Sequence, residues 1–297
     1  FFIFNRMKIF FETVLDEVYR NIDLEKTYFI IPNQRAKIFL KKEILKKISA
    51  ASISPQIFSI DAFIQKIADI KESPRTNQLF YLYECYMELS QKKDFESYSL
   101  FRKWSNTLLN DINDIDMGMA DYNEVFENLY QIHKLEAITD EEAEKKLAFW
   151  SMIPNIVKSF KAKLIKNNIY SKGMCHVFAK ENIDMFSNAN KDFSFIFLGL
   201  NSLSNNEEFI VSYLLENNKS QIFWDTDESF IKNREHEAGL YFRKYINEWN
   251  YYKTNKFNWQ QSVLSRPKNI FIYETTKQIA QVKTEANLVQ EIFKNKS

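Results

Sequence analysis

The sequence predicts an α/β fold built on a parallel sheet, with an all-helical domain inserted into it. Short, continuously apolar segments bounded by polar or turn residues lie near both ends of the chain, and segments with helical periodicity separate them. Alternating strands and helices favour parallel strands joined by crossover helices. Between residues 75 and 190, apolar residues recur only at helical spacing. This central segment is therefore expected to be the insertion.

The first part of the α/β domain is expected at residues 1–74. Pro32 ends a strand that is apolar throughout, as expected for a parallel strand buried on both faces. Asp61 is expected to cap the helix after the second strand, and Pro74 closes this part. The expected elements are, in order, a helix, a strand, a helix, a strand and a helix at residues 7–22, 27–31, 34–48, 56–60 and 62–70.

Strands return after the helical domain, which is expected at residues 75–190. The second part of the α/β domain is expected at residues 191–266. Residues 267–297 are expected to begin a further α/β domain that is cut off within the chain. Strands are expected at residues 193–198, 221–224 and 270–273, and helices at about 206–216 and 235–248.

Composition and length bound the class of protein. The chain has 297 residues, of which 45% are hydrophobic, so two domains with ordinary cores are expected. A formal net charge of +1 excludes a molecule-wide positive field, so any contact with nucleic acid has to come from local patches. Cys85 and Cys175 have no Cys or His at metal-ligand spacing, which favours buried free thiols in a reducing compartment.

No segment predicts export or insertion into a membrane. No apolar run reaches the ~20 residues that a membrane-spanning helix needs. The N-terminal segment FFIFNRMKIFF is apolar but contains Arg6 and Lys8, and no small-residue cleavage site follows it. A cytoplasmic protein without membrane contact is therefore expected. Natural translation from Met7 would make residues 1–6 foreign to the protein.

The chain has only four glycines, and their positions exclude a phosphate-binding loop near its start. A P-loop of the form GxxxxGK[ST] needs glycines so that its backbone can wrap a phosphate, and it needs a Lys and a hydroxyl for phosphate and magnesium. The glycines are Gly118, Gly173, Gly199 and Gly239. ATP hydrolysis by a Walker mechanism is therefore not expected, and no catalytic residue is predicted.

A polar turn and a basic helix follow the first predicted strand. The turn stands at the carboxyl end of that strand, where parallel α/β sheets bind ligands. The helix carries six basic residues against Glu43, hence a formal charge of +5 in a chain of +1. Two interpretations stay open, a surface that contacts a phosphate backbone and a lysine face that is only solvated. The candidate DNA-contact residues are Asn33, Gln34, Arg35, Lys37, Lys41 and Ser59.

The densest acidic cluster, Asp225, Asp227 and Glu228, follows the predicted strand at residues 221–224. Carboxylates at a strand end are ligands for divalent cations. We favour the interpretation that these three acids face water and bind no cation, because the spacing places no further His or carboxylate beside them. The three histidines are scattered along the chain, and no metal site is predicted.

Six segments carry a family resemblance over essentially the whole chain. They are FIIPNQRAKIFLKKEI, ISPQIFSIDAFIQKI, FRKWSNTLLNDINDID, FIFLGLNSLSNNEEFIVSYLL, the WDTD of QIFWDTDESF, and EAGLYFRKY. In this order and spacing they resemble the N-terminal part of AddB-like proteins, the PD-(D/E)XK nuclease family of RecBCD/AddAB-type repair complexes, in the form typical of Bacteroidota.

The resemblance implies a degenerate superfamily 1 helicase-like domain of the P-loop NTPase type. PNQRAKIFL looks like the first DNA-contact motif after the P-loop, and IFSIDAF looks like the next one. FIFLGLNSLSNNE is similar to the Walker B segment, with Leu198 and Gly199 in place of its acids. QIFWDTDESF looks like the motif that couples nucleotide to DNA. The final ETTKQIAQVKTEANLVQEI looks like the opening of a second motor domain.

The resemblance also implies a function. The expected role is a non-catalytic, helicase-like scaffold of an ATP-dependent helicase/exonuclease in DNA double-strand-break repair and recombination, which guides a DNA strand and docks an AddA-like helicase subunit. The family's divalent metal and iron–sulfur cluster belong to a C-terminal nuclease whose motifs do not occur in this sequence, so no cofactor is expected here. Two alternatives stay open, a divergent active ATPase or nuclease and a protein-interaction module without DNA contact.

Overall fold

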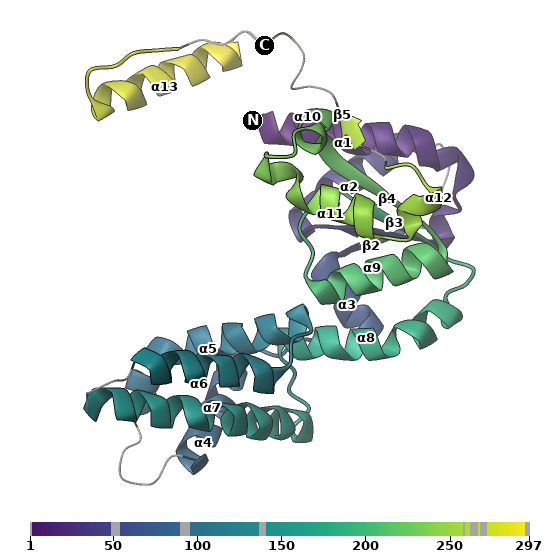
Figure 1. Ribbon diagram of the computed structural model, residues 1–297. Coiled ribbons are helices and arrows are strands. Elements are labelled where there is room, and N and C mark those ends of the chain that lie inside the picture. Colours follow the sequence, from purple (N-terminus) through teal and green to yellow (C-terminus); the bar gives the residue numbers. More distant parts are fainter. Residues whose placement is uncertain are drawn as a thin grey trace. The chain divides into compact units, whose positions relative to one another are not determined.

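The computed structural model of the chain, shown in Figure 1, describes residues 2–48, 54–89, 96–136, 141–257, 259–261, 267 and 272–294. The chain divides into two compact units, Phe1–Gln261 and Ser262–Ser297, and each is described by itself. The first unit contains a parallel sheet with its covering helices and a bundle of long helices. The second unit contains the helix α13, Gln278–Lys294.

Five parallel strands form the sheet in the order β2-β1-β3-β4-β5. Their bounds are Thr27–Ile31 for β1, Gln56–Ser59 for β2, Ser194–Leu198 for β3, Lys219–Asp227 for β4 and Trp259–Gln261 for β5. Every residue of β1 is buried, because this strand has a neighbour on each edge and helices over both faces. The predicted α/β fold with a parallel sheet is confirmed.

Helices cover both faces of the sheet (Figure 1). The side chains of β1 alternate between the two faces. Phe29 and Ile31 of β1 pack with the helices α1 and α2 on one face. Tyr28 and Ile30 pack on the other face, in the core that α3, α8, α9 and α11 complete. The bounds of these helices are Phe2–Val18, Gln34–Lys47, Ile60–Ala68, Lys172–Ala189, Asn205–Asn217 and Leu240–Glu248.

The strand order reverses between β1 and β3. β1 leads through α2 to β2 on one side, and β3 leads through α9 to β4 on the other. The two connections run over opposite faces of the sheet, as right-handed crossovers require. In open parallel sheets, ligands bind outside the carboxyl ends of the strands at such a reversal. This edge is therefore the place to look for a site.

The described residues between 75 and 166 form helices and no strand. Their bounds are Arg75–Leu89 for α4, Tyr98–Gly118 for α5, Tyr122–Glu136 for α6 and Glu141–Lys166 for α7. These helices have a core of their own, with Phe101 and Phe160 fully buried in it. α8 contributes to both cores, because Met174 packs in the bundle while Cys175 and Ala179 pack under the sheet. None of the described helices combines the length and the hydrophobicity needed to cross a bilayer.

Short elements complete the first unit. Two 3₁₀ turns precede β1, and a short helix, a 3₁₀ turn and another short helix follow β4. Their bounds are Tyr19–Asn21, Leu24–Lys26, Glu228–Lys232 for α10, Glu237–Gly239 and Tyr251–Thr254 for α12.

Several element predictions need correction. Ser59, and not Asp61, caps α3, because the helix begins at Ile60 and its cap has to precede that residue. β4 is longer than predicted and includes the strand-end acids Asp225 and Asp227, whereas Glu228 begins α10. β5 is not predicted by the sequence. Residues 270 and 271 of the strand predicted at 270–273 lie outside the described residues, and residues 272 and 273 are not in a strand.

Candidate functional site

The turn after β1 and the turn after β2 are joined by a hydrogen bond at the carboxyl edge of the sheet. Gln34 donates from Nε2 to Ser59 Oγ over 3.0 Å. Ser59 Oγ also accepts from the backbone N–H of Ala62 at 3.4 Å, as the cap of α3. Asn33 caps α2 by accepting from Ala36 N at 3.0 Å. Two predicted contact residues, Gln34 and Ser59, are therefore brought together, but the buried Ser59 hydroxyl is engaged inside the protein.

The basic residues of α2 are spread along the helix. Arg35 in the first turn and Lys41 are exposed, whereas Lys37 is half-buried. At 1.5 Å per residue, the Cα atoms of Arg35 and Lys41 are separated by about 9 Å along the helix axis. At the far end of α2, Lys46 pairs with Glu43 at 2.7 Å and Lys47 pairs with Asp16 of α1.

The charge of α2 is thus partly compensated at the end that lies away from the carboxyl edge of the sheet. Arg35, Lys37, Lys41 and Lys42 have no ion pair with any side chain in the described part of the chain. The uncompensated cations therefore lie between residues 35 and 42 of α2, a stretch that includes the predicted contact residues Arg35, Lys37 and Lys41.

β3 ends in a buried aliphatic side chain and a glycine turn. The side chain of Leu198 is fully buried in the core beneath α1 and α2. Gly199 has a φ of +63°, which favours glycine, and its N–H donates to Phe223 O at 2.9 Å. A Cβ at Gly199 would lie 3.4 Å from the ring of Phe10 and 3.9 Å from Cβ of Asp225. At the two positions where the resemblance places acids, the sheet therefore has no carboxylate.

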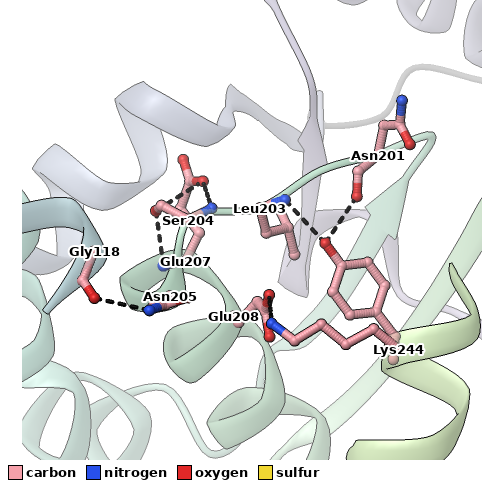
Figure 2. A network of polar contacts seen from close by, with 9 residues as sticks. Gly118, Asn201, Leu203, Ser204, Asn205, Glu207, Glu208 and Lys244 are labelled. Carbon is pink, nitrogen blue, oxygen red and sulfur yellow. Dashed lines mark hydrogen bonds and ion pairs between the residues drawn. The ribbon is translucent and has the colours of Figure 1, made fainter. Parts of the chain in front are cut away.

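A tyrosine from α11 fixes the loop between β3 and α9, as Figure 2 shows. The hydroxyl of Tyr245 accepts from Leu203 N at 2.9 Å and donates to Asn201 O at 3.0 Å. Burial raises the pKa of Tyr245, so this hydroxyl stays protonated and able to donate. Trp224 stacks on the Tyr245 ring, with 5.3 Å between the ring centroids.

Further polar contacts fix the start of α9 (Figure 2). Ser204 and Glu207 form a capping box, in which Glu207 N donates to Ser204 Oγ at 3.3 Å and Ser204 N donates to Glu207 Oε2 at 2.8 Å. Asn205 Nδ2 donates to Gly118 O of α5 at 2.8 Å. Lys244 of α11 pairs with Glu208 over 2.7 Å. The loop is held from several sides, which is typical of a structural element.

Two of the three acids at the end of β4 have local structural partners. Asp227 caps α10, because its Oδ1 accepts from Ser229 N at 3.0 Å and from Ser229 Oγ at 2.8 Å. Glu228 pairs with Lys232 one turn later, at 2.7 Å. Asp225 is half-buried. These contacts account for Asp227 and Glu228 without a bound cation.

The structure brings together a cluster that the sequence did not predict. Asp61 in the first turn of α3, His176 on α8 and Glu207 in the first turn of α9 each offer a ligand atom, and these atoms lie within 4.8 Å of one another. Lys172 pairs with Asp61 at 2.8 Å. Burial, together with the nearby Lys172 ammonium, lowers the pKa of His176 to about 4, and Asp61 opposes this shift. His176 is therefore a neutral imidazole at pH 7.

The sequence contains a signal for part of this cluster only. Asp61 and Glu207 both stand in the first turn of a helix that follows a parallel strand, so the topology places both at one edge of the sheet. His176 comes from a helix that begins at the end of the inserted bundle, and no spacing rule brings it there.

Among models of protein families and among curated proteins, none matches this chain.

Proposed function

We propose that this chain is a non-catalytic, helicase-like scaffold that guides a DNA strand along the carboxyl edge of its sheet. In this proposal it belongs to a helicase–nuclease complex that acts in double-strand-break repair, and it docks the motor subunit of that complex. The observation that supports it most is the joined pair of strand-end turns. The bond from Gln34 to Ser59 fixes the turn after β1, and the exposed Arg35 stands in the adjacent first turn of α2.

The start of α2 has the physical properties of a phosphate-binding surface. The first turn of a helix has backbone N–H groups without intrahelical partners, and its dipole favours negative charge. α2 has 14 residues, and Asn33 fixes where it begins. Arg35 adds an exposed guanidinium that can bind a phosphate with two hydrogen bonds, and Lys41 continues the positive charge along the helix.

The missing nucleotide chemistry supports a scaffold over a motor. The chain has no glycine before Gly118, and Leu198 and Gly199 stand at the end of β3. The loop that follows is fastened by Tyr245 and by the capping box of Ser204 and Glu207. A fixed loop without carboxylates at these positions retains the architecture of a nucleotide site without the groups that bind magnesium and activate water.

One observation favours the alternative of an interaction module without DNA contact. Lys46 and Lys47 are paired with Glu43 and Asp16, so the predicted charge of α2 is smaller in the folded protein than in the sequence. Under this alternative, Arg35, Lys37 and Lys41 form a solvated face only. Measured DNA affinity distinguishes the two proposals.

The test is the affinity of the chain for a fluorescent single-stranded oligonucleotide, measured by anisotropy between 50 and 200 mM salt. We expect the triple variant Arg35→Ala, Lys37→Ala, Lys41→Ala to bind about tenfold more weakly or worse, with the slope of log K against log salt reduced by roughly 2. The matched control removes three exposed lysines elsewhere in the first unit, Lys219, Lys253 and Lys256.

The control variant has the same net charge as the test variant, so it reports the effect of overall charge alone. A scaffold that contacts DNA through α2 requires a larger loss of affinity in the test variant. Equal affinity and equal salt slope in the two variants would exclude the contact and leave the interaction module.

A further inference from the structure

Three helices bring the cluster of Asp61, His176 and Glu207 together, and each helix is fixed at its start by a cap. Ser59 caps α3 by accepting from Ala62 N at 3.4 Å, and Ser171 caps α8 by accepting from Met174 N at 3.3 Å. The capping box of Ser204 fixes α9. The three side chains therefore project from rigid positions, as ligands of a bound ion have to.

The environment of His176 indicates a bound ligand, and this evidence does not depend on the two carboxylates. Its side chain is 1% exposed, and its Nδ1 has no hydrogen-bond partner. Leaving a buried polar atom without a partner is costly, so such an atom in a native protein calls for a bound group. An imidazole nitrogen lies within 4.8 Å of carboxylate oxygens of both Asp61 and Glu207, and a small cavity of about 10 Å³ adjoins His176 and Asp61.

We propose that Asp61, His176 and Glu207 bind a divalent transition-metal cation, with Zn²⁺ as the preferred ion. One imidazole nitrogen and two carboxylate oxygens form a ligand set that Zn²⁺ accepts, whereas Mg²⁺ and Ca²⁺ prefer oxygen ligands alone.

The surroundings of the three ligands suit a metal site. Ser204 donates from N and from Oγ to Glu207 Oε2, at 2.8 and 3.0 Å, which orients the carboxylate as the outer partners of metal ligands do. The side chain of Asp61 is 50% exposed, so the ion can enter from solvent and a water molecule can complete its coordination. Lys172 pairs with Asp61 at 2.8 Å, so binding of the ion requires Lys172 to move away from Asp61.

The ion would join the two parts of the first unit. Asp61 and Glu207 belong to helices that follow strands of the sheet, whereas His176 lies on α8, the helix shared by both cores. Asp61 also lies two residues after Ser59, which fixes the proposed DNA-contact turn. Zn²⁺ is thus expected to stabilise the carboxyl edge of the sheet, without taking part in a reaction.

The test is binding of Zn²⁺ to the full chain after treatment with a chelator, measured by isothermal titration and by thermal unfolding. We expect one equivalent to bind, and we expect Tm to rise by several degrees at saturation because the ion binds only the folded protein. Asp61→Asn removes one ligand at an exposed position and should weaken binding about tenfold or more. Millimolar Mg²⁺ should not displace the bound Zn²⁺.

Asp69→Asn is the matched control, since it makes the same chemical change just beyond the other end of α3 and should leave Zn²⁺ affinity unchanged. His176→Asn tests the buried ligand, and Asp61→Asn keeps the proposal testable if that variant does not fold. Absence of stoichiometric binding would overturn the proposal. Equal Zn²⁺ affinity in the Asp61→Asn and Asp69→Asn variants would overturn it as well.

Discussion

At the scale of the residue, the hydroxyl of Tyr245 holds the loop between β3 and α9 in place. It bonds to a buried backbone N–H of Leu203 and to the carbonyl of Asn201 (Figure 2). The Tyr245 ring packs against both Trp224 and Trp249, at centroid distances of 5.3 and 4.7 Å. One side chain from α11 thereby provides hydrogen-bond partners for two backbone groups of the loop that have none within the loop's own backbone.

We predict that Tyr245→Phe lowers the free energy of unfolding by about 1–3 kcal/mol, because the buried N–H of Leu203 loses its acceptor. Urea denaturation monitored by circular dichroism measures this difference. Tyr241→Phe is the matched control, since it removes a hydroxyl from the same helix at a side chain that is 41% exposed. If both variants are as stable as the parent chain, the hydroxyl of Tyr245 does not fix the loop.

The accuracy of a prediction for a single residue depends on whether its contacts come from neighbouring residues in the sequence. His236 caps the short turn that follows it, because its Nδ1 accepts from Ala238 N at 3.2 Å, and this contact depends only on neighbouring residues. Asp61 was expected to cap α3, but Ser59 does so because the helix begins two residues earlier than the apolar pattern suggested. His176 gave no signal at all, since its neighbours in space come from Asp61 and Glu207, far away in sequence.

At the scale of the element, α8 connects the helical bundle to the sheet, and its start lies very close to α5. Gly173 N donates to Asn113 Oδ1 at 2.8 Å. A Cβ at Gly173 would lie 2.7 Å from Cβ of Asp116 and 2.9 Å from Cα of Asn113. Both atoms belong to or adjoin the backbone of α5, so they cannot move aside without separating the two helices.

We therefore predict that Gly173→Ala lowers the free energy of unfolding by about 1–3 kcal/mol, the usual cost of overpacking. Gly118→Ala is the control on another helix, because a Cβ there would meet no atom within 4 Å. That change should be neutral or stabilise the chain by up to about 1 kcal/mol, through helix propensity. Thermal and urea unfolding of both variants measure the difference, and equal stabilities would contradict the close approach of α5 and α8.

The elements that the sequence predicts best are the strands that are buried on both faces of the sheet. β1 and β3 are continuously apolar because helices cover both faces, and that pattern can be read without knowing their partners. β5 has three residues, two of them glutamines, and it forms by pairing with β4 across a shift in register. The strand depends on its pairing with β4 and not on the β propensity of its own residues, so no local pattern predicts it.

At the scale of the whole molecule, the parallel topology brings sequence-distant polar groups to one edge. The turns that follow β1 and β2 meet through the hydrogen bond from Gln34 to Ser59. The sequence could not predict how far the charge of α2 is compensated, because Asp16 pairs with Lys47 from another helix. It also could not predict the three-helix cluster, which depends on how the inserted bundle returns to the sheet.

The same edge leads to a prediction for the whole chain: it should not hydrolyse ATP, with or without DNA. No glycine occurs before Gly118 to wrap a phosphate, and β3 ends at Leu198 in place of a carboxylate. Release of labelled phosphate from ATP and Mg²⁺, followed across size-exclusion fractions of the purified chain, measures this. The expected rate in the fractions that contain the chain equals the rate of buffer alone.

If ATPase activity is found in the fractions that contain the chain, mutation of an acid at the strand ends shows whether the chain is its source. Among the strand-end acids, Asp225 has its Cβ 3.9 Å from the Cβ position of Gly199, so an active site at this edge would use Asp225. Asp192→Asn is the matched control, because Asp192 is an exposed acid just before β3, at the opposite edge of the sheet. A rate that falls in Asp225→Asn but not in Asp192→Asn would show an ATPase and refute the scaffold. A rate equal in both variants would exclude Asp225 as the carboxylate that holds magnesium.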